Sequence, residues 1–438
     1  MAFHFMRDSR EQLVLDEIDA ANRALAKADR KRKYRKMSES PYNFFRGTNH
    51  LFWGDVWQDW RYYLFGGVQN TQTWLQGDAH VYNHGSYGDD SQGIHYGMDD
   101  FDDALVGDYQ YDLWRHAASM VLDAEENVDL APDEIRRAIR HLLSTYLDTL
   151  VQHQDGRPAD DIHVHYMKEP LSHFMKKVMK KSGPQKYLAK WTVVDNGERR
   201  FNLDKKKMGR VSASEREQLV AALAEQYPGT LDGNGSTPPA SHFKVKDIAR
   251  RVDAGIGSLG LDRYYALIEG ATDGPDDDII LDIKEQTPPP AYRFMRNRER
   301  RAWRKTFCNE GHRHFQAFHA LADHPDEYLG WLSLGKKHFS VRERSPYKKD
   351  FPTHKIKNFK QYRRLTRQWG RILAREHIRG ARTLHPDAHG TFCKAVLQRC
   401  EAHREDFKEM VVDLAFTYAR CVKKDYAVFV AERCPADG

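Results

Sequence analysis

Two short stretches of sequence dominate this chain: Gln76-Gly77-Asp78-Ala79-His80-Val81-Tyr82-Asn83 and, after a polar interval, Met98-Asp99-Asp100-Phe101-Asp102-Asp103-Ala104. The second places four aspartates within five residues. Carboxylates this close repel one another and raise each other's pKa, and a bound divalent cation removes that cost. The stretch is therefore either an exposed acidic turn or part of a metal site, and short motifs alone do not separate the two.

A glycine-rich segment lies far downstream, at Gly255-Ile256-Gly257-Ser258-Leu259-Gly260. Glycines let backbone N–H groups approach phosphates closely because no Cβ blocks them. A strand pattern at 264–268 follows, whereas a dinucleotide fingerprint would open a helix at this point. A second apolar run, from Ile279, ends at Lys284. The pattern predicts that the glycine segment and Lys284 bind phosphates. The alternative for the glycine segment is a tight turn, and the alternative for Lys284 is a lysine that faces solvent.

Helical periodicity covers much of the remaining chain. We expect helices over residues 10–35, 113–121, 132–151, 309–323, 362–378 and 392–430. A strand pattern predicts a hairpin formed by residues 328–331 and 338–341, with Gly335 in its turn. The Lys-, Gly- and Pro-rich region 154–240 is interpreted as a substrate-side insertion followed by a linker.

The composition is that of a globular protein with a mild basic excess. The chain has 438 residues, 40% of them hydrophobic, and 69 basic against 63 acidic residues give a net charge of +6. This permits an anionic ligand without indicating a specific nucleic-acid partner. The five cysteines are scattered, which favours neither disulfides nor a zinc site. No apolar run indicates a membrane span, so we expect a cytoplasmic protein; its oligomeric state has no signal in the sequence.

These motifs together resemble the protein-kinase-like superfamily, in particular its aminoglycoside phosphotransferase and choline kinase branch. The resemblance rests on G-D-x-H-x-x-N from Gly77 and on D-F-D-D-A from Asp100, followed by Gly107-Asp108 and Tyr111-Asp112-Leu113. The wider pattern, including Ser40 to Gly47 and Ile283-Lys284-Glu285, is similar to the uncharacterised bacterial family DUF2252.

The kinase resemblance implies ATP and Mg²⁺ as cofactors and gives each motif a role. Asp78 would accept the proton of the acceptor hydroxyl, and Asp112 would brace the loop that carries it. Arg46 would bind a phosphate or pair with an aspartate. The remaining expected ligands are Asn83, Asp100 and Asp102 for the metal and Gly255, Gly257, Ser258, Gly260 and Lys284 for the nucleotide phosphates. A glutamate from helix 309–323 should pair with Lys284, and Glu310 is the nearest candidate.

The motifs occur in rotated order, with the catalytic loop ahead of the glycine loop. We therefore expect an α+β, two-lobed protein-kinase-like fold with a circularly permuted chain, which is tolerated where termini lie close together. A helical C-lobe would comprise residues 1–240 and 355–438, and a small antiparallel N-lobe residues 241–354.

The predicted function is an ATP- and Mg²⁺-dependent phosphotransferase acting on a small-molecule hydroxyl. Three alternatives remain open: nucleotidyl transfer on the same fold, a nucleotide-binding pseudokinase, and a metal-dependent hydrolase. The hydrolase would add His80 and His84 to the aspartates.

Overall fold

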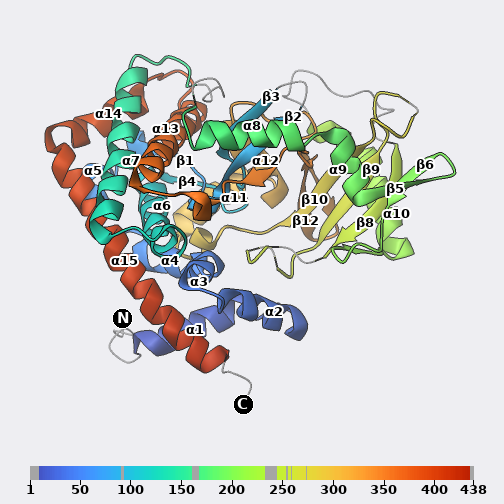
Figure 1. The fold of residues 1–438 in the computed structure, drawn as a ribbon, viewed down its shortest axis with the longest axis horizontal. Coiled ribbons are helices and arrows are strands. Elements are labelled where there is room, and N and C mark those ends of the chain that lie inside the picture. Colours follow the sequence, from blue (N-terminus) through green and yellow to red (C-terminus); the bar gives the residue numbers. More distant parts are fainter. Residues whose placement is uncertain are drawn as a thin grey trace.

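A six-stranded antiparallel sheet forms one side of the molecule (Figure 1). The computed structural model describes residues 9–89, 93–159, 167–231, 244–252, 255–257, 259–272 and 274–434. The strand order is β11 (Gly330–Leu334), β12 (Lys337–Glu343), β10 (Ile279–Gln286), β9 (Arg263–Ile268), β8 (Val245–Arg251) and β7 (Met208–Gly209). The predicted strands at 264–268 and 279–284 and the hairpin at Gly335 are confirmed.

The two faces of this sheet are covered by segments that precede it in sequence. Successive residues of a strand point to opposite faces. Tyr264 and Ala266 accordingly pack with α10 (Ala213–Glu225), while Tyr265 and Leu267 pack with α9 (Pro184–Trp191) and the hairpin β5 (Thr192–Asp195) and β6 (Glu198–Phe201). Residues of the segment 188–231 therefore pack on the sheet.

A helical part fills the other side of the molecule (Figure 1). Its helices are α6 (Gln110–Asp123), α7 (Pro132–His153), α13 (Phe359–Leu384), α14 (Thr391–Cys400) and α15 (Arg404–Arg433). α7 and α13 pack against each other, and α15 lies along α6. Segments from before and after the sheet thus share one core.

The N-terminal arm differs from its prediction as one helix over 10–35. It forms α1 (Arg10–Ala21) and α2 (Lys27–Met37), followed by α3 (Pro41–Gly47), α4 (Asn49–Val56) and α5 (Tyr62–Phe65). The break begins at Asn22, whose buried side-chain amide donates to the Ile18 carbonyl at 2.7 Å. A local side-chain bond of this kind competes with continued helix.

Shorter elements join the two parts. β1 (Gln72–Leu75) pairs with β4 (Leu105–Asp108), and β2 (His84–Asp89) lies between β3 (Gly93–Met98) and β13 (Lys349–Asp350). α8 (Leu171–Lys181) and α11 (Asn297–Thr306) lie between the parts in the view of Figure 1. α12 (Glu310–Leu321) contacts β10, β11 and β12 of the large sheet as well as α13.

The architecture is mixed α+β, and the described strands pair antiparallel throughout. Within the described residues, none of the helices combines the length and the apolar character needed to cross a membrane.

Candidate functional site

Two loops lie side by side at the centre of the molecule. Residues 76–83 form one, called the catalytic loop after the kinase motif that it resembles, and residues 99–104 form the acidic loop. The β1–β4 register places Leu75 opposite Leu105, and the β2–β3 register places His84 opposite Met98. Both loops are thereby held at both ends. Gly77 marks their closest approach, because its φ is +81° and an added Cβ would lie 1.9 Å from the carbonyl oxygen of Asp103.

We expect Gly77→Ala to destabilise the protein by about 2–6 kcal/mol. A left-handed conformation and an overpacked contact each cost about 1–3 kcal/mol. Gly197, in the β5–β6 turn, provides a matched control because its φ is +82° and no atom lies within 4 Å of a Cβ there. Urea unfolding gives the loss in free energy of unfolding for each variant, and the difference between the two losses is the cost of the backbone clash. Equal losses would contradict the close approach of the loops.

Asp112 braces the catalytic loop, as expected. Its carboxylate accepts hydrogen bonds from the backbone N–H groups of Gln76, at 2.7 Å, and Gly77, at 3.0 Å. His377 of α13 is buried, with Nε2 3.3 Å from the same carboxylate and Nδ1 2.8 Å from the Tyr146 hydroxyl. His377 is therefore a packed core residue that connects α13 to the loop.

Arg313 of α12 holds the acidic loop from the other side. Its guanidinium is fully buried and donates to the carbonyl oxygens of Asp102, at 2.6 Å, and Ala104, at 3.0 Å. Phe101 packs edge-on against Phe318 of the same helix, with ring centroids 4.9 Å apart. Glu310 pairs with Arg313 at 2.7 Å rather than with Lys284, so the expected Lys284–Glu310 pair is wrong.

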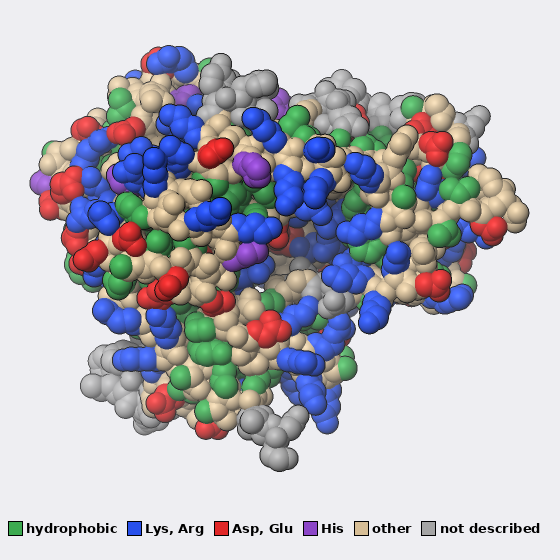
Figure 2. Space-filling view, viewed as in Figure 1, with side chains coloured by type: hydrophobic (Ala, Val, Ile, Leu, Met, Phe, Trp, Pro, Cys, Tyr) green, Lys and Arg blue, Asp and Glu red, His purple; other side chains and the backbone are tan. Residues whose placement is uncertain are grey.

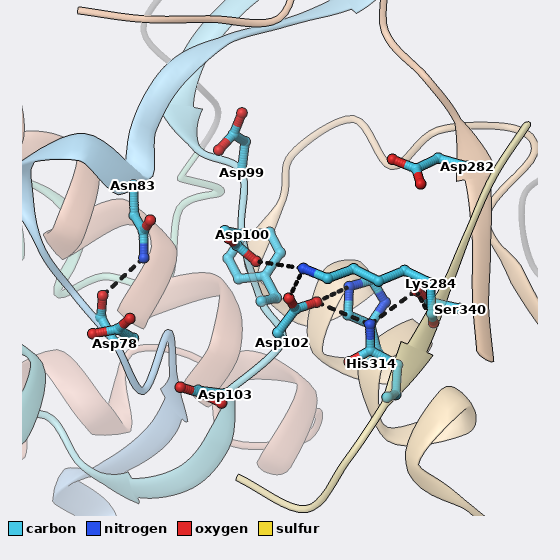
Figure 3. Close-up of polar contacts among 12 residues, drawn as sticks. Asp78, Asn83, Asp99, Asp100, Asp102, Asp103, Asp282, Lys284, His314 and Ser340 are labelled. Atoms are coloured by element: carbon cyan, nitrogen blue, oxygen red, sulfur yellow. Dashed lines mark hydrogen bonds and ion pairs between the residues drawn. The ribbon is translucent and has the colours of Figure 1, made fainter. Parts of the chain in front are cut away.

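Lys284 instead reaches the acidic loop itself (Figure 3). From β10 its ammonium forms an ion pair with Asp102, 182 residues away, and lies 4.0 Å from Asp100. Burial alone would raise the pKa of Asp102, but the Lys284 ammonium and an amide hydrogen bond from Gln286 at 2.9 Å hold it well below its usual range. The acidic loop and the lysine strand thus form one electrostatic unit.

Asp78 lies deeper and faces Arg115 of α6, at 2.5 Å. Burial raises the pKa of Asp78 to about 7, against the lowering effect of Arg115. Asn83 donates its side-chain amide to the Asp78 carbonyl at 2.8 Å (Figure 3). A carboxyl group that titrates near neutrality within a cleft has the property required of a general base.

These loops line a cavity of about 100 Å³. Its walls are formed by Arg46, Gln76, Asp78, His80, Asn83, Asp100, Asp102, Asp103, Gly255, Ile256 and Gly257. Among the described residues, the buried Nε of Arg46 has no hydrogen-bond partner. Figure 2 shows Lys and Arg side chains gathered around the hollow between the helical part and the sheet. The lining of the cavity itself combines one arginine with four aspartates.

The structure places Gly255 and Gly257 of the predicted glycine loop at this cavity. Gly260 does not line it; its φ is +88° and its Cα faces Leu25, where an added Cβ would lie 2.2 Å from a leucine methyl group. Ser258 lies outside the described residues. Gly255 and Gly257 have no atom within 4 Å of an added Cβ, so the space beside them is open.

The cavity lining offers side-chain oxygens that could hold a metal ion. Within the part of the chain that the structure describes, His, Cys, Asp and Glu side chains form no group of three or more that could hold a metal ion. His84 packs between Trp369 and His116 and does not line the cavity. Mg²⁺ instead binds through one or two protein oxygens together with substrate phosphates and water. The oxygens of Asn83 and Asp100 at the cavity wall match that requirement.

Sequence patterns missed the two buried arginines, Arg115 and Arg313. Both lie within helices, where a lone arginine resembles a solvated residue. For Arg115 the available signal was its position among apolar neighbours, such as Leu113, Trp114 and Ala117, whereas Arg313 stands between two histidines. A cation flanked by core residues requires a buried partner, and both partners here belong to the site.

Comparison with known proteins identifies a family. No curated protein and no solved structure matches the chain. A family model described as an uncharacterized protein conserved in bacteria (DUF2252) matches residues 27–432. That range includes the catalytic loop, the acidic loop, the glycine segment and Lys284. The chain therefore belongs to the DUF2252 family of bacterial proteins.

Proposed function

We propose that this protein is an ATP- and Mg²⁺-dependent phosphotransferase that acts on the hydroxyl group of a small molecule. One observation carries the proposal. The catalytic loop, the acidic loop and the glycine segment line a single cavity, and Lys284 is paired to its wall, although these segments are far apart in sequence. Phosphoryl transfer needs positioning and charge neutralisation more than covalent chemistry, and this set of groups supplies both.

A permuted kinase-like fold is part of the proposal. In protein kinases the glycine loop precedes the lysine strand, and the αC helix follows. Here the glycine segment lies between β8 and β9, Lys284 lies on the next strand, β10, and α12 comes after it. The helical part would then serve as the C-lobe.

Each group has a proposed role. The Asp78 carboxylate accepts the proton of the acceptor hydroxyl. Asn83 and Asp100 hold Mg²⁺, with Asp102 assisting, and a bound Mg²⁺ neutralises the charge of the nucleotide phosphates. Lys284, Arg46 and the N–H groups of the glycine segment bind those phosphates; the unpartnered Arg46 Nε supports this role over an aspartate pair.

The cavity is too small for a whole nucleotide. A volume of about 100 Å³ holds a phosphate group and an ion, whereas small-molecule sites occupy about 300–1,000 Å³. A nucleotide bound with its phosphates here would therefore extend beyond the cavity.

Two alternatives remain on the same geometry. Nucleotidyl transfer would use the same groups on a different phosphorus atom. A pseudokinase is favoured by the two pairs, Lys284–Asp102 and Asp78–Arg115, which neutralise the central residues without a ligand. The hydrolase has less support because His84 packs away from the cavity.

Calorimetric titration with ATP tests the proposal. We expect binding that strengthens with Mg²⁺, and we expect Asp100→Ala to weaken Mg·ATP binding about 10–100-fold, as for the loss of a charge-assisted contact of about 1.5–3 kcal/mol. Without Mg²⁺ the same variant should bind ATP equally well or better, since a like charge has been removed. No ATP binding with or without Mg²⁺ would overturn the proposed function.

A further inference from the structure

A second, larger cavity of about 530 Å³ lies beneath α8. Its apolar wall includes Phe174 and Val178 of α8 and Phe351, and the Phe174 and Phe351 rings contact each other edge-on at 5.3 Å. This volume lies within the range of small-molecule sites. The cavity is therefore large enough for a ligand with an apolar body of about one or two rings.

Five lysines surround this apolar wall: Lys177, Lys181, Lys349, Lys355 and Lys357. Among the described residues, none of the five forms an ion pair, and the lining contains only two acidic side chains, Glu169 and Asp350. Like charges gathered without counterions repel one another, and an anion relieves that repulsion. The lysine rim therefore favours a ligand that carries a phosphate or carboxylate group.

The wall of this cavity is attached directly to the candidate site. β13 pairs with β2, placing Asp350 opposite Gly85, two residues after Asn83. The Tyr82 hydroxyl lies 2.6 Å from Thr353 Oγ1, and Lys348 pairs with Asp99 of the acidic loop at 2.9 Å. Two residues of strand and one interstrand step span about 10 Å, so the cavity wall lies about that far from Asn83.

We infer that this cavity binds an anionic small molecule with an apolar body, and that this molecule is the phosphoryl acceptor. The second part rests on the proposed function, whereas the binding itself does not. An acceptor anchored by its anionic group on the lysine rim would have to span about 10 Å, the length of a small metabolite, to bring its hydroxyl to the candidate site. Positive charge beside the transfer centre also offsets repulsion between an anionic acceptor and the nucleotide.

A binding experiment with 1-naphthoate, an aromatic ring system bearing one carboxylate, tests the site. We expect Lys177→Gln/Lys355→Gln to weaken binding about tenfold, since two exposed positive charges at the rim are lost. The matched control is Lys176→Gln/Lys180→Gln. It also removes two positive charges, but from positions of α8 that do not line the cavity. The control should bind as the wild type does, and 2-naphthylmethanol, which lacks the charge, should bind more weakly.

Saturating Mg²⁺ and a non-hydrolysable ATP analogue should leave 1-naphthoate binding intact. Equal losses of affinity in the two double variants would overturn the anion site, and displacement of 1-naphthoate by the nucleotide analogue would overturn its assignment to the acceptor. Either result would leave the phosphotransferase proposal standing, because neither depends on catalysis.

Transfer of labelled phosphate from ATP to the small-molecule fraction of a bacterial extract tests the acceptor assignment. The Lys177→Gln/Lys355→Gln variant should lose most of the transfer while it binds Mg·ATP normally, and the control pair should retain it. Undiminished transfer in the pocket variant would overturn the assignment. Specific 1-naphthoate binding without transfer by any variant would overturn the transferase and the acceptor role together, leaving an anion-binding cavity.

Discussion

Replacing Asp78 by asparagine should lower turnover by about 10²–10⁴-fold, the range of a lost general base. Asparagine keeps the shape of the side chain and still accepts a hydrogen bond from Arg115, so the loop should stay in place. It cannot take up the proton of an acceptor hydroxyl. Because a base acts in the transition state, kcat should fall much more than Mg·ATP affinity.

The pH dependence distinguishes this role from a structural one. With the pKa of Asp78 raised to about 7, only the carboxylate form accepts a proton, so kcat/KM of the wild type should rise with pH through about 7. The residual rate of Asp78→Asn should lack that rise. Asp123→Asn is a matched control, because burial raises the pKa of Asp123 to about 6 and this residue does not line the cavity. Unchanged turnover in Asp78→Asn, or loss of the pH-dependent rise in the control, would remove Asp78 from catalysis.

The elements that could be predicted from sequence are those fixed by local pattern. β9, β10, α7 and α13 have regular apolar spacing, and their type followed from it. Motif order alone predicts that the catalytic and acidic loops lie close together. The β1–β4 and β2–β3 pairings account for their proximity. Gly255 and Gly257, which lie between β8 and β9 in the sequence, line the same cavity.

What could not be predicted depends on tertiary partners. The ion partner of Lys284 is an aspartate of the acidic loop rather than a glutamate of α12, because Arg313 occupies the position facing that loop and binds Glu310 itself. Residues 188–231 resemble a linker in composition, yet they cover the sheet, since scattered apolar residues such as Trp191 and Leu223 find partners only in three dimensions. Propensity is a weak prior wherever packing decides the outcome.

The ion pair between Lys284 and Asp102 should have separable effects on stability and on nucleotide binding. Lys284→Met leaves the Asp102 carboxylate without its ammonium partner. Breaking a buried pair from one side costs about 3–5 kcal/mol. Since the Asp102 side chain is 28% exposed, we expect a loss near the lower end, about 3 kcal/mol in the free energy of unfolding. Mg·ATP binding should weaken about 10–100-fold as the phosphates lose a charged donor.

The double variant Lys284→Met/Asp102→Asn separates the two effects. Removing both charges leaves no unpaired carboxylate, so much of the lost stability should return, with a coupling of about 0.5–3 kcal/mol. Nucleotide affinity should not return, because the phosphates still lack the lysine. A double-mutant cycle compares the wild type, the two single variants and the double variant. Chemical unfolding measures their free energies of unfolding, and calorimetry measures their affinities for Mg·ATP. Recovery of Mg·ATP affinity along with stability would mean that Lys284 acts only as a structural partner of Asp102, and the cleft would then resemble a stabilised polar core rather than a phosphate site.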